Sequence, residues 1–283
     1  MTIGIGVLCS SKPKPHLPRP DTIIMMADTM GSTETDSTED LHKLYAEHGK
    51  HFVAVCAGNV EMAAEVVSLF DEKYSALTPK THGGIWSTLN DIAHGLRAEH
   101  FSWDVIRTRY TPLPGQILQS QQDKLIEEWQ AYDYGLCVLL GTFDHRGMAH
   151  LYEVGAIRDE YGAIKGLVRS HLFPGHWTIG SGAYNATQWL NFRNQQLGLH
   201  PVQSAYHAYE AKIMASQAPT VNRNLEVVVA YADRHYFLSQ EHPEVSGCPV
   251  SIPQLKKMFK QYGPRDANAI GHPSIFRRST SKK

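Results

Sequence analysis

Residues 1–9 read Met1-Thr2-Ile3-Gly4-Ile5-Gly6-Val7-Leu8-Cys9, an apolar run that begins with a hydroxyl-bearing residue directly after the initiator methionine. The run predicts a β-strand at the start of the fold. A small residue at position two allows Met1 to be removed. Thr2 would then carry a nucleophilic hydroxyl and a free α-amine that can serve as its base. A single threonine is a weak signal, so this interpretation depends on the rest of the chain.

The composition is that of a globular chain without bulk charge. It has 283 residues, 42% of them hydrophobic, enough to bury a sizeable core. Lys and Arg number 27 against 28 Asp and Glu, which favours neither nucleic acid nor an anionic membrane surface. No apolar run approaches the ~20 residues that span a bilayer, and the start lacks a signal-peptide pattern, so we expect a cytoplasmic protein. The four cysteines lie far apart and indicate no disulfide framework.

Hydrophobic periodicity divides the chain into alternating groups of strands and helices. Apolar runs bounded by turn residues predict strands at 2–9, 22–28, 41–45, 51–57, 135–143, 148–154, 177–179, 224–231 and 235–239. Helical spacing predicts helices that begin near Val60 and others at 85–100, 116–129, 183–197, 201–217 and 253–262. This order is not the alternation of a doubly wound sheet. It predicts an α+β fold in which two mainly antiparallel sheets pack face to face, with helices on their outer faces.

Five short motifs follow one another along the same chain. They are Thr2-Ile3, Ile23-Ile24-Met25-Met26-Ala27-Asp28-Thr29-Met30-Gly31, Lys43-Leu44, Val55-Cys56-Ala57-Gly58 before an alanine-rich helix, and Ile179-Gly180-Ser181-Gly182-Ala183. In order and approximate spacing, across residues 2–240, they resemble the N-terminal-nucleophile hydrolases, and within them the proteasome β-subunits and bacterial proteasome-like peptidases. The resemblance implies a four-layer αββα sandwich.

The resemblance also implies a role for each of five residues. Thr2 resembles the nucleophile, Asp28 the buried carboxylate, and Lys43 the ammonium that lowers the pKa of the α-amine. The backbone N–H of Gly58 resembles the oxyanion donor. Ser181 resembles the serine that assists proton movement around the amine. Four of them have a plain structural alternative: Asp28 as a strand-end turn residue, Lys43 as a solvated strand lysine, Gly58 as a strand-to-helix turn, and Ser181 as a helix cap.

An extended peptide substrate is implied along two backbone segments. These are Gly31-Ser32 and Gly58 to Val60, which would pair with the peptide as an added strand. Strand registers are hard to read from sequence, so His42 or Lys50 remains an alternative to Lys43.

Three segments depart from the family pattern. The proline-rich loop at about 10–20 and the stretch at about 101–132 are insertions in the domain at 2–240, and residues 241–283 form a C-terminal extension expected to be peripheral or partly disordered. Before its next-to-last strand the family has an aspartate and a Ser-Gly-Gly step. This chain instead has Ser216-Gln217-Ala218-Pro219-Thr220-Val221-Asn222, without a carboxylate.

Two functions follow from these features. The first is a threonine peptidase that cleaves peptide or protein substrates through an acyl ester on Thr2 after Met1 removal; the alternative is a catalytically silent proteasome-like subunit with a structural or assembly role. The resemblance implies no cofactor, a homo-oligomer that can close into a ring, and an ATPase partner. The 16 histidines include no His-Glu-x-x-His motif and no repeated helical ligand spacing, so no metal site is predicted.

Overall fold

The computed structural model shows an α+β protein built on two antiparallel sheets. It describes residues 3–12, 19–28, 31–32, 37–38, 43–46, 50–109, 119–216 and 224–264. The first sheet consists, in spatial order, of β10 (His176–Gly180), β1 (Ile3–Cys9), β2 (Thr22–Ala27), β11 (Glu226–Tyr231) and β12 (His235–Leu238). The second consists of β5 (Leu44–Tyr45), β6 (Phe52–Gly58), β7 (Leu136–Phe143), β8 (Ala149–Arg158) and β9 (Ile164–Ser170). A separate small hairpin joins β3 (Gly31–Ser32) to β4 (Ser37–Thr38).

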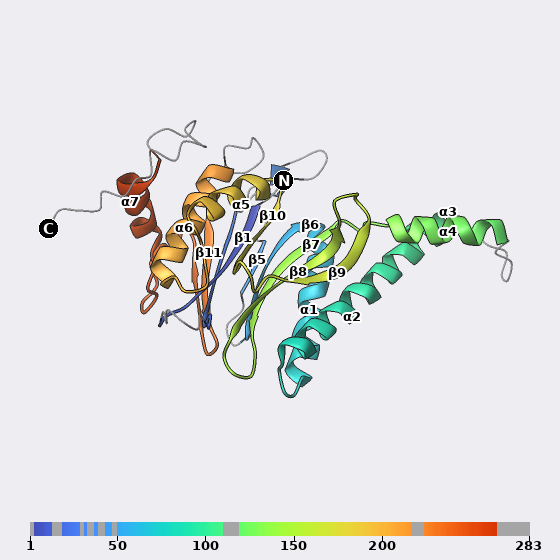
Figure 1. Ribbon diagram of the computed structural model, residues 1–283, viewed down its shortest axis with the longest axis horizontal. Coiled ribbons are helices and arrows are strands. Elements are labelled where there is room, and N and C mark those ends of the chain that lie inside the picture. Colours follow the sequence, from blue (N-terminus) through green and yellow to red (C-terminus); the bar gives the residue numbers. More distant parts are fainter. Residues whose placement is uncertain are drawn as a thin grey trace.

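The two sheets face each other, and helices cover their outer faces (Figure 1). The helices are α1 (Val60–Ala76) and α2 (His82–Phe101) on the second sheet, and α5 (Ala183–Phe192) and α6 (Pro201–Ala215) on the first. The α+β class and the two antiparallel sheets predicted from the order of elements are therefore confirmed.

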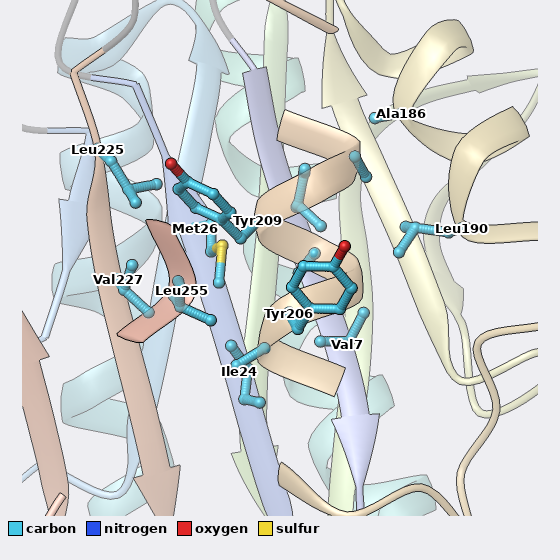
Figure 2. Close-up of a cluster of buried hydrophobic side chains, with 14 of the residues drawn as sticks. Val7, Ile24, Met26, Ala186, Leu190, Tyr206, Tyr209, Leu225, Val227 and Leu255 are labelled. Atoms are coloured by element: carbon cyan, nitrogen blue, oxygen red, sulfur yellow. The ribbon is translucent and has the colours of Figure 1, made fainter. Parts of the chain in front are cut away.

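Helix α6 is buried along nearly its whole length on the first sheet. Tyr206 and Tyr209 of α6 lie among strand residues such as Val7 and Met26 (Figure 2). Helix α7 (Ile252–Tyr262) packs outside α6 and adds Leu255 to the same apolar cluster. This part of the chain beyond residue 240 thus shares the core of the first sheet, and the helix predicted at 253–262 is confirmed. Residues 265–283 lie outside the described part of the chain.

The second sheet buries its outer face against an amphipathic α1. Asn59 caps this helix, because its side-chain oxygen accepts from the backbone N–H groups of Glu61 and Met62 at 3.1 and 3.2 Å. The helical residues that face the sheet recur every three or four positions, and one of them, Phe70, meets Phe52 of β6 edge-on at 5.2 Å. The helix predicted after Gly58 is confirmed.

The segment at about 101–132 forms a helical extension beside the sandwich. It contains the π-helical turn η1 (Ser102–Ile106), α3 (Arg107–Arg109) and α4 (Gln119–Ala131), with residues 110–118 outside the described range. In Figure 1, α3 and α4 project away from both sheets. The base is held where the Phe101 ring packs edge-on against Trp129 at 5.1 Å. The helix predicted at 116–129 is confirmed with shifted ends.

Among the differences from the predicted elements, three have a clear local cause. Strand β9 is not predicted, because as an edge strand it buries only Leu167 and Val168 and shows no clear alternation. Helix α2 begins three residues early, where Thr81 caps it by accepting from Gly84 N at 3.1 Å. Helix α5 ends at residue 192 instead of 197, just before Asn194 adopts a left-handed conformation with φ of 51°.

Close approach of the two sheets depends on glycine in β1. A Cβ atom on Gly6 would lie 2.8 Å from side-chain methyl groups of both Leu139 and Leu151 on the second sheet. Those two leucines are fully buried, so they have little room to shift. The Gly4-Ile5-Gly6 pattern therefore serves sheet packing.

We expect Gly6→Ala to destabilise the protein by about 1–3 kcal/mol, because the added methyl group overpacks the space between the sheets. Gly95→Ala is the matched control: Gly95 lies on an exposed part of α2 with no atom within 4 Å of an added Cβ. Its replacement should stabilise the helix by roughly 0.5–1 kcal/mol. Urea denaturation measures both changes. Equal effects of the two substitutions would contradict the close approach at Gly6.

Candidate active site

A buried ion pair joins the two sheets where β2 ends and β5 begins. Lys43 Nζ lies 3.3 Å from Asp28 Oδ1 and donates a hydrogen bond to it. The side chains are 2% and 0% exposed, so each charge has lost nearly all contact with water. Charges buried to this extent are tolerated only when they are paired. The structure therefore brings together two of the residues that the sequence selects.

The same carboxylate oxygen holds the start of β1. Ile3 N donates to Asp28 Oδ1 at 3.2 Å, and Asp28 N donates to the Ile3 carbonyl at 3.3 Å. The other oxygen, Asp28 Oδ2, is buried without a hydrogen-bond partner among the described residues. Ile3 directly follows Thr2 in the sequence, and Thr2 itself lies outside the described residues. The carboxylate thus contacts the backbone one residue after the expected nucleophile.

Burial and nearby negative groups shift the pKa of Lys43 in opposite directions. Burial lowers the pKa of Lys43, and the carboxylate of Asp28 opposes that shift most strongly. Glu226 opposes it further. Burial also raises the pKa of the Cys56 thiol to about 11, so this thiol is protonated at neutral pH. The pKa of Lys43 is therefore lowered overall, and Asp28 limits that shift most.

The sequence alternatives to Lys43 are resolved in part. Lys50 forms an ion pair with Asp71 at the surface, where both side chains are about one-third exposed, and it is not the residue that pairs with Asp28. His42 lies outside the described residues. Among the residues that the structure describes, Lys43 is the cation that binds Asp28.

Gly58 forms the turn between β6 and α1 with φ of 86°, a conformation that glycine adopts without strain. A Cβ atom here would lie only 2.1 Å from the carbonyl oxygen of Gly135, so this turn excludes a side chain. That carbonyl also accepts from Asn59 N at 3.0 Å. Val60 follows as the first residue of α1, and its carbonyl accepts from the Tyr45 hydroxyl at 3.4 Å. The turn is thus fixed on both sides.

Ser181 follows β10 in the sequence, beside the start of β1. The antiparallel register places Gly180 opposite Ile3, so Ser181 is one residue beyond that pair. Ser181 does not act as the cap of α5: the N-cap residue is Gly182, and no side-chain hydrogen bond caps the helix. Asp28 thus bonds to Ile3, the first residue of β1, Lys43 bonds to the same oxygen of Asp28, and Ser181 follows the residue opposite Ile3.

The two remaining substrate-binding predictions fall on β3. Gly31 and Ser32 form this short strand, which pairs with Thr38 and Ser37 of β4. The hairpin is separate from both large sheets. Its backbone continues the chain only three residues beyond Asp28.

Glu226 is a buried carboxylate that the short motifs do not select. It is the first residue of β11, is 2% exposed, and lies directly opposite Ala27 in the antiparallel pairing with β2. The family pattern has a carboxylate before this strand. The corresponding residues here are 216–222, most of which lie outside the described range. The sequence offers one signal, which is that Glu226 directly precedes the apolar run 227–230. A glutamate at the start of a buried strand stands out because glutamate is rarely buried unless it is paired.

Other kinds of site find no support in the described ranges. No group of three or more His, Cys, Asp or Glu side chains there is arranged to hold a metal ion. Among the described helices, none is long and apolar enough to cross a bilayer.

Comparison with known proteins adds no assignment to this geometry. No protein-family model matches the chain, and no curated protein matches it.

We expect Asp28→Ala to destabilise the protein by about 3–5 kcal/mol, because it leaves the buried ammonium of Lys43 without its partner. The double substitution Asp28→Leu/Lys43→Met removes both charges and should cost less than the single one. Asp233→Ala, at an exposed aspartate, is the control and should change stability by less than ~0.5 kcal/mol. Chemical denaturation at neutral pH measures all three. A double substitution that costs as much as Asp28→Ala, or more, would contradict the ion pair.

Proposed function

We propose that the chain is an amide hydrolase of the N-terminal-nucleophile type, with Thr2 as its nucleophile once Met1 has been removed. The observation that carries the proposal is the double use of Asp28 Oδ1, which binds both Lys43 Nζ and the amide nitrogen of Ile3. The amide bond between residues 2 and 3 includes that nitrogen, so the α-amine of a processed chain begins one residue from the ion pair. We infer further that the facing sheets and their outer helices are the αββα sandwich of this superfamily.

The chemistry follows from the groups near this position. The α-amine has an ordinary pKa near ~8, and the fixed positive charge of Lys43 favours its neutral form, which can accept the hydroxyl proton of Thr2. The hydroxyl oxygen then bonds to the carbonyl carbon of a peptide substrate. The C–N bond breaks, and the leaving amine takes the proton from the α-ammonium. An ester to Thr2 remains, and water releases it with the α-amine again acting as base.

Gly58 fits the role of supplying an N–H group to the oxyanion that forms in this reaction. Gly58 is exposed at the end of β6, and it has no side chain. The β3 hairpin and the turn at residues 58–60 supply backbone for an extended peptide. The resemblance to proteasome-like proteins extends the proposal to a ring of copies of this chain, served by an ATPase.

A threonine-directed covalent inhibitor tests the nucleophile. In purified native protein, intact mass should show loss of Met1, and peptide mapping should locate the inhibitor on Thr2. Thr2→Ala should abolish labelling, whereas Thr88→Ala, at a threonine on α2, should leave it unchanged. Retention of Met1 in all molecules would overturn the mechanism. In that case the silent structural subunit becomes the better assignment.

Lys43→Met should lower kcat/KM for a cleaved peptide by about 100-fold or more, because the α-amine loses the charge that favours its basic form. The matched control is Lys50→Met, which removes a lysine of the same strand region that pairs with Asp71 at the surface. The control should retain activity within about twofold of wild type. Thermal unfolding of both variants must show that they fold. Equal losses in the two variants would reject the role of Lys43.

A further inference from the structure

A cavity of about 430 Å³ lies at the end of the sandwich opposite the ion pair of Asp28 and Lys43. Asp21 lines it directly before β2 and Asp28 follows that strand, so the cavity and the ion pair are roughly 20 Å apart. Its walls are the β1–β2 connection of the first sheet and the β7–β8 turn of the second. Beside it, Ala149 N donates to the Pro20 carbonyl at 2.8 Å and joins the two walls. The volume falls in the range of small-molecule sites, about 300–1,000 Å³.

Three basic side chains line this cavity without a carboxylate partner. They are Lys12 and Arg19 from the β1–β2 connection and Arg146 from the β7–β8 turn. Among the residues that the structure describes, Lys12 and Arg19 have no ion-pair or side-chain hydrogen-bond partner, and Arg146 donates only to His145 Nε2, at 3.3 Å. The intervening residues 13–18 have the sequence Pro-Lys-Pro-His-Leu-Pro and contribute no acidic group. The three cations are therefore available to an anion from solution.

Arginines elsewhere in the described ranges already have partners. Four pair with carboxylates and three lie over tryptophan rings, so the described arginines without either kind of partner are Arg19 and Arg146. The four are Arg109, Arg158, Arg193 and Arg234, and the three are Arg97, Arg107 and Arg169. Both arginines without such a partner line the same cavity.

The two carboxylates in the lining accept from other donors. Asp21 accepts from the backbone N–H of Ser11 at 2.7 Å and from the Ser11 hydroxyl. Asp144 accepts from the backbone N–H groups of Arg146 and Met148 at 2.8 and 2.9 Å. These bonds fix the backbone that carries the cations and occupy the carboxylate oxygens. Three cations against two carboxylates also leave an excess of positive charge in the lining.

We propose that this cavity binds a small anion with two or more linked phosphate groups. A guanidinium donates in a planar fork that matches phosphate oxygens, and an ammonium adds a point charge. Cations on two walls suit an anion longer than a single phosphate. The described lining has no aromatic ring on which a base could stack, so the phosphate groups are what it recognises. The bound anion links the two sheets at this end, and the proposal is independent of the hydrolase.

Isothermal titration calorimetry of the full chain with tripolyphosphate in metal-free buffer tests this site. Arg19→Gln and Arg146→Gln should each raise Kd about tenfold or more, because each removes charge-assisted hydrogen bonds to the anion. Arg234→Gln is the matched control, since Arg234 is an exposed arginine of the β11–β12 turn that pairs with Asp233. It should change Kd by less than about twofold. Tripolyphosphate should also raise Tm of the wild type and the control more than that of the two site variants.

NMR and further ligands decide between the possible results. The backbone amide signals of Ser11 and Gly147 should shift when tripolyphosphate binds. Tighter binding of ATP than of tripolyphosphate would support the site and assign it to nucleotides, whereas equal or weaker binding would support it as a site for the phosphate chain alone. Inorganic phosphate that binds as tightly would overturn the requirement for linked phosphates, and hexa-aspartate that does so would indicate a docking surface for acidic protein segments instead. Absence of binding, shifts confined to other regions, or an equal loss in Arg234→Gln would reject the site.

Discussion

The site depends on a single carboxylate oxygen that serves two donors from different parts of the chain. Asp28 Oδ1 accepts from Lys43 on the second sheet and from the backbone of Ile3 in the first. One atom therefore fixes the separation of the sheets at this end and the position at which β1 starts. Its energetic weight comes from burial: neither partner can exchange the other for water. A displacement of Asp28 would therefore weaken both bonds together.

The layers of the fold could be predicted from sequence because they follow from the local periodicity of hydrophobic residues. The apolar runs of β1 and β2 and the helical repeat after Gly58 each bury a face large enough to be recognised without tertiary information. The misses have a common cause. Strand β9 is an edge strand with two buried residues, and α5 ends two residues before a left-handed Asn194. Both features depend on tertiary context more than on residue pattern.

The site residues that lie on short sequence motifs could be predicted. Those whose role depends on which side chains face each other across the two sheets could not. Asp28 and Lys43 stand at the ends of recognisable strands, so their order along the chain was enough to select them. The choice of Lys43 over Lys50 needed the tertiary structure, because only the structure shows which lysine is buried against Asp28. Glu226 was missed for a related reason. Alternate residues of β11 point to opposite faces of its sheet. Which of these faces looks toward the second sheet is known only from the tertiary structure.

The two sheets differ in the sequence separation of their paired strands. We therefore expect the second sheet to form before the first. The second sheet joins consecutive strands from β5 to β9, so its pairings can form as each strand leaves the ribosome. The first sheet places β1 and β2 between β10 and β11, strands separated from them by well over a hundred residues. Contacts of such long range form slowly because the loop-closure entropy is lost before they are gained. During synthesis β2 therefore has one edge uncovered until β11 has been made, and Asp28 and Glu226 come together late.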